Sequence, residues 1–97
     1  MLAQKDVIEG LEQQNSAREQ EKQRIFDDQQ RLRENMKALK GSAEERTLVQ
    51  RYTQQLNDQE TRLESLRREI AETVAKRESA QAVLDRMIAE LSFDVKL

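Results

Sequence analysis

The stretch Val49 to Leu91, VQRYTQQLNDQETRLESLRREIAETVAKRESAQAVLDRMIAEL, decides the fold of this chain. If one residue is taken from this stretch at alternating steps of three and four, most of the residues selected are apolar. These positions are Val49, Tyr52, Leu56, Gln59, Leu63, Leu66, Ile70, Thr73, Arg77, Ala80, Leu84, Met87 and Leu91. On a helix, this spacing produces a narrow apolar stripe that is buried against another helix, as in a coiled coil. The stretch therefore predicts a long helix that has a helical partner.

A second stripe with the same spacing precedes it, between Leu2 and Leu39. It is weaker, because only about half of its positions are apolar. Its positions are Gln4, Ile8, Leu11, Asn15, Arg18, Lys22, Ile25, Gln29, Leu32, Met36 and Leu39. The segment from Glu12 to Arg24 offers only Ala17 to an apolar core. We expect this part to be helical through its amino-acid propensities and through its partner helix.

Between the two stripes, the residues of a helix end are followed at once by those of a helix start. Gly41 can adopt the left-handed backbone that ends a helix. Ser42 and Glu45 have the spacing of a capping box, in which each side chain accepts a hydrogen bond from the other residue's backbone N–H. The alternative is one continuous helix through Gly41 that pairs with another molecule. We predict a hairpin, because a glycine followed by a capping box is typical of a turn.

Two registers suit a chain that folds back in this way. If the paired residue numbers add up to 88, Gln29 meets Gln59 and Leu32 meets Leu56. If they add up to 81, the turn is tighter and Lys22 meets Gln59. Side-chain matching favours the first register, because it places glutamine opposite glutamine.

These patterns predict an all-α fold, an antiparallel two-helix coiled-coil hairpin that associates into a dimer or a four-helix arrangement. The predicted organisation is a first helix over residues 3–40, a tight turn at 41–42, a second helix over 43–91 and a non-helical tail over 92–97. In the tail, apolar and polar residues alternate from Leu91 onward, which is typical of the start of a strand. A lone strand of this length has no partner here, so we expect the chain to be an excerpt of a longer protein or its tail to dock elsewhere.

The middle of the second stripe predicts association with another helix. In either register, Leu63, Leu66 and Ile70 face a set of first-stripe residues that is at least partly polar, and this set includes Asn15, Arg18 and Lys22. We do not expect one hairpin to bury these three side chains fully, so we predict self-association or a helical protein partner. The predicted interaction seam consists of Leu63, Leu66, Ile70, Leu84, Met87 and Leu91.

Composition argues against most kinds of active site. Charged residues make up 37% of the chain, and histidine and cysteine are absent, so the commonest acid–base, nucleophilic and thiolate metal chemistry has no residues to use. Asp27 and Asp28 are adjacent and therefore project about 100° apart around a helix, which is poor geometry for a metal. We predict no enzymatic activity, no cofactor and no metal site. We also predict no membrane insertion, because no apolar run approaches the roughly 20 residues that span a bilayer.

The residues around the turn are modestly basic. Arg31, Arg33, Lys37, Lys40, Arg46 and Arg51 outnumber Glu34, Glu44 and Glu45. Such a tip could contact RNA or an acidic partner, and in this the chain resembles the hairpin arms of seryl-tRNA synthetases. Nucleic-acid binding is nevertheless disfavoured, because the net charge is −2 and no aromatic platform or glycine-rich phosphate loop accompanies the tip.

The segment RIFDDQQRLRENMKALKGSAEERTLVQRYTQQLNDQETRLESLRREI, Arg24 to Ile70, covers about half of the chain. It is similar to the coiled-coil segment of a family of uncharacterised bacterial proteins, the mucoidy-inhibitor-like group. The most distinctive parts are the run Arg31 to Asn35, the Gly-Ser turn, and the pair Arg51 and Tyr52. The resemblance implies a helical insert or appendage on a larger, mainly β protein of the bacterial envelope, and it carries over no catalytic residues.

From the sequence we therefore expect a structural coiled-coil spacer or protein–protein interaction module of a larger bacterial protein. The alternative is a helical arm of an enzyme or a nucleic-acid machine that contacts RNA or an acidic partner through the basic tip.

Overall fold

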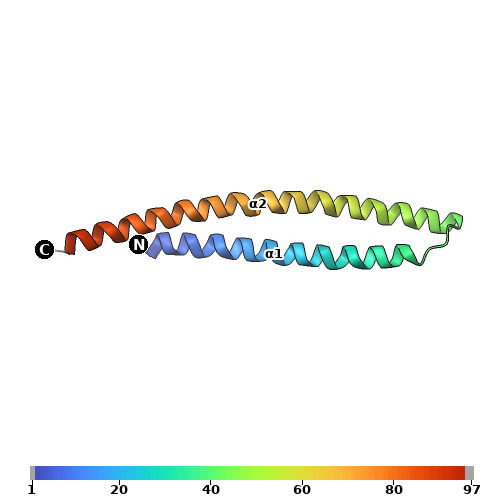
Figure 1. Ribbon diagram of the computed structural model, residues 1–97, viewed down its shortest axis with the longest axis horizontal. Coiled ribbons are helices and arrows are strands. Elements are labelled where there is room, and N and C mark those ends of the chain that lie inside the picture. The colour runs from blue at the N-terminus through green and yellow to red at the C-terminus, as the bar shows by residue number, and fades with distance from the viewer. Residues whose placement is uncertain (1, 96–97) are drawn as a thin grey trace. The chain divides into compact units, whose positions relative to one another are not determined.

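The computed structural model describes the backbone of residues 2–95 and the side chains of residues 3–92. Within this part there are two α-helices and no strand. Helix α1 (Leu2–Lys37) and helix α2 (Ala43–Val95) are joined by residues 38–42 (Figure 1). The two helices form an antiparallel all-α hairpin, which confirms the predicted fold class and excludes one continuous helix through Gly41.

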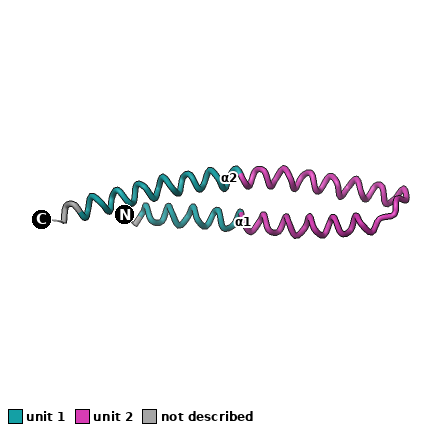
Figure 2. The backbone as a smooth tube through the Cα atoms, in the orientation of Figure 1, with its two compact units in different colours: residues 1–18, 68–97 teal, residues 19–67 magenta. Residues whose placement is uncertain are grey.

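The hairpin divides into two compact units, each built from a segment of α1 and a segment of α2 (Figure 2). Unit 1 contains residues 1–18 and 68–97, and unit 2 contains residues 19–67 together with the connection. Each unit has buried side chains of its own. All of these buried residues occupy positions of the two predicted stripes.

The core of unit 2 is made of leucines. Leu32 from α1 and Leu63 and Leu66 from α2 have no exposed surface. Full burial of a leucine side chain contributes about 1.5–3 kcal/mol to stability, so these three residues dominate the packing of this unit. Gln29 is also buried here, and it lies on the same stripe as Leu32.

The core of unit 1 is smaller and more polar. Its buried residues are Ile8, Thr73 and Ala80. Side-chain amides of α1 help to fill the interface by hydrogen bonding to backbone carbonyls of α2. The Gln4 Nε2 donates to the Ala80 carbonyl oxygen at 2.9 Å, and the Asn15 Nδ2 donates to the Ile70 carbonyl oxygen at 3.3 Å. Fewer and smaller apolar residues therefore hold this unit together.

Hydrogen bonds between the helices of unit 2 decide the register. The Gln59 Nε2 donates to the Asp28 Oδ2 at 2.6 Å, and the Gln29 Nε2 donates to the Glu60 Oε1 at 2.9 Å. These two pairs lie on either side of the register in which residue numbers add up to 88. The alternative register, which pairs Lys22 with Gln59, is wrong.

Helix α1 ends at Lys37, three residues earlier than predicted. The amides of Ala38 and Leu39 bond to carbonyls three residues earlier, at 3.3 and 3.2 Å, and this tightening closes the helix. The connection therefore spans residues 38–42 rather than 41–42 alone. Gly41 has a φ of 90°, in the region that favours glycine, and it bends this connection rather than directly ending the helix.

The predicted non-helical tail over 92–97 is wrong for residues 92–95, because α2 continues to Val95. A strand needs a second strand to satisfy its backbone hydrogen bonds, and the described part of the chain contains none. A helix satisfies these groups within itself, so the helical conformation continues despite the alternating pattern. Residues 96–97 lie outside the described residues.

Candidate interaction surfaces

The turn carries the predicted capping box and one further hydrogen bond. The Glu45 backbone N–H donates to the Ser42 Oγ at 3.1 Å, and the Ser42 N–H donates to the Glu45 Oε1 at 3.1 Å. The second carboxylate oxygen, Glu45 Oε2, accepts from the Lys40 N–H at 2.7 Å. One carboxylate therefore starts α2 and also satisfies a backbone donor of the connection after α1 has ended.

The basic residues at the tip fall into two groups. Arg31 forms an ion pair with Asp28, and Lys37 forms one with Glu34, each three residues apart on α1. Among the described residues, Arg33, Lys40, Arg46 and Arg51 make no side-chain ion pair. All four are exposed, so the free positive charge of the predicted basic tip lies on these side chains.

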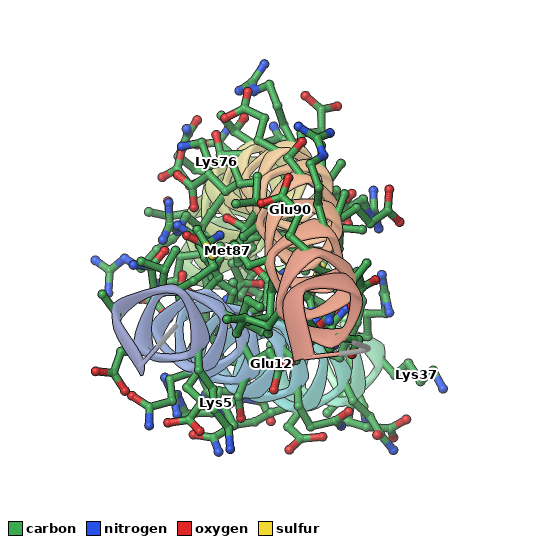
Figure 3. All side chains as sticks on the ribbon, turned by 90° about the vertical axis from the view of Figure 1, so that its left-hand side faces the viewer. Lys5, Glu12, Lys37, Lys76, Met87 and Glu90 are labelled. Atoms are coloured by element: carbon green, nitrogen blue, oxygen red, sulfur yellow. The ribbon has the colours of Figure 1, made fainter. Side chains whose placement is uncertain are left out.

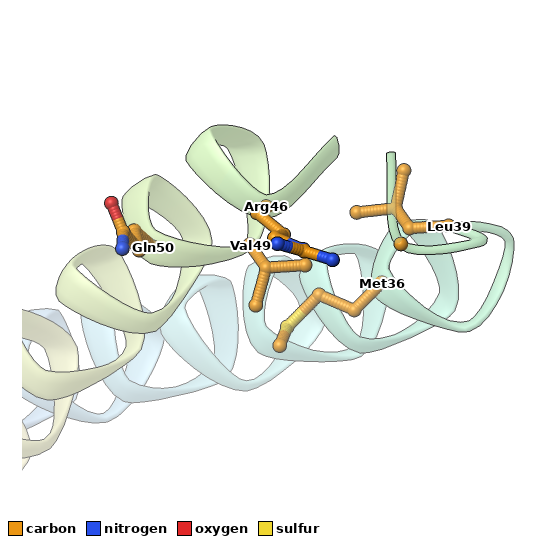
Figure 4. Close-up of a pocket in the computed structure, with 6 residues that line it drawn as sticks. Met36, Leu39, Arg46, Val49 and Gln50 are labelled. Carbon is orange, nitrogen blue, oxygen red and sulfur yellow. The ribbon is translucent and has the colours of Figure 1, made fainter. Parts of the chain in front are cut away.

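An open apolar pocket of about 430 Å³ lies at the same tip (Figure 4). It is lined by residues of both helices and of the connection: Met36, Leu39, Gly41, Arg46, Val49 and Gln50. Met36, Leu39 and Val49 supply apolar surface, and the exposed Arg46 supplies a positive charge beside them. The pocket therefore suits a partner that combines apolar side chains with a carboxylate.

The middle of the predicted interaction seam is buried at two of its three residues. The prediction that one hairpin cannot fully bury this region is wrong for Leu63 and Leu66, which have no exposed surface, whereas Ile70 is only half-buried. The reason is the shape of the charged residues on α1. The Arg18 and Lys22 side chains are only 25% and 20% exposed, so their long aliphatic stems cover apolar surface while their charged ends reach partners.

The partners of Arg18 show how unit 1 accommodates this charge. The Arg18 Nη1 donates to the Thr73 Oγ1 at 2.6 Å and to the Asn15 Oδ1 at 3.1 Å, and its Nε lies 3.5 Å from the Glu69 Oε2. Arg77 behaves similarly at the edge of the interface, where its Nε donates to the Glu12 Oε1 at 2.8 Å. The polar stripe residues Arg18 and Arg77 therefore find their partners inside unit 1.

Among the described residues, most of the large apolar side chains that remain exposed lie at the open end of unit 1; the others are Val7, Phe26 and Val74. At the open end Leu84 is half-buried, but Met87 and Leu91 are 38% and 47% exposed. Helix α2 has 53 residues and α1 has 36, so the last turns of α2 extend past the beginning of α1 (Figure 1). We call the exposed residues Val83, Met87, Ile88 and Leu91 the open-end patch. Figure 3 looks onto this end of unit 1, with Met87 and Glu90 labelled on α2.

Two members of the open-end patch were missed in the sequence. Val83 and Ile88 are 38% and 45% exposed, and they lie directly beside the stripe positions Leu84 and Met87. A signal was available, since apolar residues that flank a stripe widen it into a face that one partner helix does not cover. Val7 of α1, 49% exposed, is a further apolar residue of unit 1.

Three carboxyl groups of unit 2 titrate below their ordinary range. The hydrogen bond from Arg62 lowers the pKa of Glu21, and the bond from Arg31, assisted by the one from Gln59, lowers the pKa of Asp28. The backbone N–H groups of Lys40 and Ser42 lower the pKa of Glu45. In each case the folded hairpin therefore favours the charged form of the carboxylate.

Among the described residues, no group of three or more acidic side chains is placed to hold a metal ion.

Within residues 2–95, neither helix combines the length and apolar character that a membrane span requires.

Comparison with protein-family models, with curated proteins and with solved structures found no match to this chain.

Proposed function

We propose that this chain is a coiled-coil module that works as a structural spacer or binds another protein through helix surfaces, without catalysis of its own. The observation that carries the proposal is the open-end patch. Four large apolar side chains are exposed there on a helix whose stripe is otherwise buried or half-buried from Val49 to Leu84. Clustered exposed apolar residues on a helix are typical of protein-binding surfaces.

The burial pattern supports the coiled-coil part of the proposal. Side chains at the stripe positions from Gln4 to Leu39 and from Val49 to Leu84 are buried or half-buried. A repeat of three and four residues that is buried along two antiparallel helices is the arrangement expected for a coiled coil. The resemblance of Arg24 to Ile70 to a coiled-coil segment of larger envelope proteins adds the prediction that the module serves a larger bacterial protein.

Sedimentation velocity over a range of chain concentrations tests the interaction role. We expect the sedimentation coefficient of the wild-type chain to rise with concentration. The variant Met87→Gln/Ile88→Gln/Leu91→Gln should remain monomeric, because it removes most of the exposed apolar surface. A wild-type chain that stays monomeric up to about millimolar concentration, at which even weak association with a free energy of about −4 kcal/mol is visible, would contradict self-association through the open-end patch.

A matched control separates loss of association from loss of folding. Glu64→Gln, Glu72→Gln and Lys76→Gln change three exposed residues of α2 away from the open-end patch, and this variant should associate like the wild type. Circular dichroism should show the same helix content in both triple variants, because none of the six positions is buried.

The alternative function, contact of the tip with RNA, is favoured by the four basic side chains that lack ion pairs. Fluorescence anisotropy of a labelled single-stranded RNA at low salt tests it. Binding that weakens with salt and disappears in Arg33→Gln/Arg46→Gln/Arg51→Gln would support the RNA-binding arm. No binding at about 20 mM salt would eliminate it, because the electrostatic contribution is largest under that condition.

A further inference from the structure

We propose that the tip of one molecule binds the open end of a second copy of this chain, in a head-to-tail contact. This inference rests on the proposed function and names the partner. It rests on two surfaces, one in each unit. One surface is concave and the other is a helical ridge, and the two are opposite in charge. One is the apolar pocket at the tip of unit 2, and the other is the open-end patch of unit 1.

The two surfaces match in their apolar parts. The tip pocket of about 430 Å³ is concave and lined by Met36, Leu39 and Val49, so it has room for more than one apolar side chain. The open-end patch is part of a helix and presents Met87 and Leu91, one turn apart, at 38% and 47% exposure. A helical apolar ridge entering an apolar groove is a common mode of recognition between helical proteins.

The two surfaces are opposite in charge. Around the pocket, the exposed basic residues that form no ion pair with other described residues outnumber the exposed Glu44; they are Arg33, Lys40, Arg46 and Arg51. Around the open-end patch, acidic residues outnumber the basic residues Lys5 and Arg86. The acidic residues there, within residues 3–10 and 80–92, are Asp6, Glu9, Asp85 and Glu90. A basic pocket therefore selects the acidic open end of a second copy, whereas two open ends would repel each other.

Glu90 is the acidic residue best placed to guide the contact. It is exposed and lies between Met87 and Leu91 in the sequence, so it reaches the tip together with the apolar ridge. Arg46 is the basic residue that lines the pocket (Figure 4). The head-to-tail contact thus pairs Arg46 of one copy with Glu90 of the next.

Such a contact has a specific geometric consequence. Because the binding surfaces are different, a molecule that binds through its tip still has a free open end, and a molecule that binds through its open end still has a free tip. Heterologous contacts of this kind produce rings or open chains, whereas a contact between two identical surfaces stops at a dimer. The expected product is a series of oligomers that lengthens with concentration.

The test uses two variants that each block one surface. Arg46→Glu/Gln50→Glu places negative charge at the pocket, and Met87→Glu/Leu91→Glu places charge on the open-end patch; all four positions are exposed. Each variant alone should sediment as a monomer, with an association at least about tenfold weaker than that of the wild type. A one-to-one mixture should form a dimer and nothing larger, because only one intact tip and one intact open end remain in each pair.

The outcomes separate this inference from the proposed function. If the tip variant alone associates like the wild type, the open end binds somewhere other than the tip, so the proposed function stands and the head-to-tail contact is wrong. If the mixture stays monomeric, the head-to-tail contact is also wrong. A wild-type chain that never associates contradicts the head-to-tail contact and self-association through the open-end patch. The charge swap Arg46→Glu/Glu90→Arg should restore association that either single change weakens, which a merely structural effect would not do.

Discussion

The leucine core of unit 2 and the open end of unit 1 use the same three-and-four repeat but reach opposite states of burial. Leu63 and Leu66 have no exposed surface, although the α1 stripe near them contains the charged Lys22. Leu91, an equally apolar residue of the same α2 stripe, is 47% exposed. The difference shows that the presence of a partner helix decides burial more than the polarity of the side chains it offers.

The physical reason lies in the length of charged side chains. A lysine or arginine on the partner helix covers a leucine with its methylene groups and carries its charge to the edge, as Lys22 does toward the Glu19 Oε2 at 3.5 Å. At the open end, the chain offers no such cover within its described part, because α1 begins at Leu2 while α2 continues to Val95. Within the described residues, the part of α2 beyond the reach of α1 therefore exposes more apolar surface than the part that packs on a polar stretch of α1.

The largest predicted change in the free energy of unfolding comes from replacing one leucine in each region by alanine. Leu66→Ala should lower the free energy of unfolding by about 2–5 kcal/mol, since it leaves a cavity in a closed core. Leu91→Ala should lower it by less than about 0.5 kcal/mol, because that side chain is already half in water. Urea unfolding followed by circular dichroism measures both at low chain concentration. Equal decreases in the free energy of unfolding for the two variants would contradict the difference in burial between these two regions.

A second change addresses the polar layer inside the unit 2 core. Gln29 is 2% exposed, and the Gln59 Oε1 is buried without a hydrogen-bond partner among the described residues. Gln29→Leu/Gln59→Leu should raise the free energy of unfolding by about 1–2 kcal/mol, because it removes buried polar groups and adds apolar burial.

The same double variant should loosen the register, because polar residues in a helical interface favour one alignment at a cost in stability. Spin labels at Arg24 and Arg67, both in unit 2, would report this as a broader distance distribution than in the wild type. A variant that is less stable than the wild type, or equally uniform in register, would show that the glutamines act differently from this account.

The two glycines provide a smaller pair of effects with opposite signs. Gly10 lies inside α1, in unit 1, and an added Cβ would meet nothing within 4 Å. Gly10→Ala should therefore stabilise the hairpin by about 0.5–1 kcal/mol. Gly41→Ala also meets no atom, but the φ of 90° disfavours alanine, so it should destabilise by about 1 kcal/mol. Thermal melting of both variants checks the signs; two changes of the same sign would be inconsistent with these backbone conformations.

The smallest predicted effect is the pH dependence of unit 2. The pKa values of Glu21 and Asp28 are lowered from 4.5 and 3.8, so these carboxylates contribute stability above those values and lose it as pH falls through their folded pKa. The melting temperature should therefore decrease as the pH is lowered below about 4.5.

Glu21→Gln removes one of these groups and should make that decrease shallower. Glu64→Gln, at an exposed position of the same unit, serves as the control and should leave the profile like that of the wild type. Because the Glu21–Arg62 pair is partly exposed, added salt should reduce the difference between Glu21→Gln and the wild type. If the melting temperature of Glu21→Gln depended on pH in the same way as that of the wild type, Glu21 would not contribute to the pH dependence of stability.

Much of the fold was predictable because local chemistry and periodicity agree. Ser42 and Glu45 form the expected cap, and the glutamine pairing at Gln29 and Gln59 indicated the correct register. The end of α1 at Lys37 and the bond from the Lys40 amide to Glu45 were not predicted. Local sequence does not report such contacts across a turn.

The candidate surfaces were predicted less well than the fold. A stripe shows which side chains face a partner helix but not how completely that partner covers them. Leu63 and Leu66 were therefore predicted to belong to an interaction surface, although they are buried. Val83 and Ile88 were overlooked, although they are exposed. The relevant information was the unequal length of the two helices, which becomes certain only once the beginning of α1 and the register are known.

The contrast in burial along α2 is tested most directly by cysteine accessibility, because the chain contains no cysteine of its own. Single variants Leu63→Cys and Leu91→Cys would each be reacted with a maleimide at about micromolar chain concentration, after circular dichroism confirms that both are folded. We predict that Leu91→Cys reacts nearly as fast as an unstructured thiol and that Leu63→Cys reacts on the order of 100-fold more slowly, because it must wait for local opening. Similar reaction rates at the two positions would contradict the claim that one hairpin buries the core of unit 2 and leaves its open end exposed.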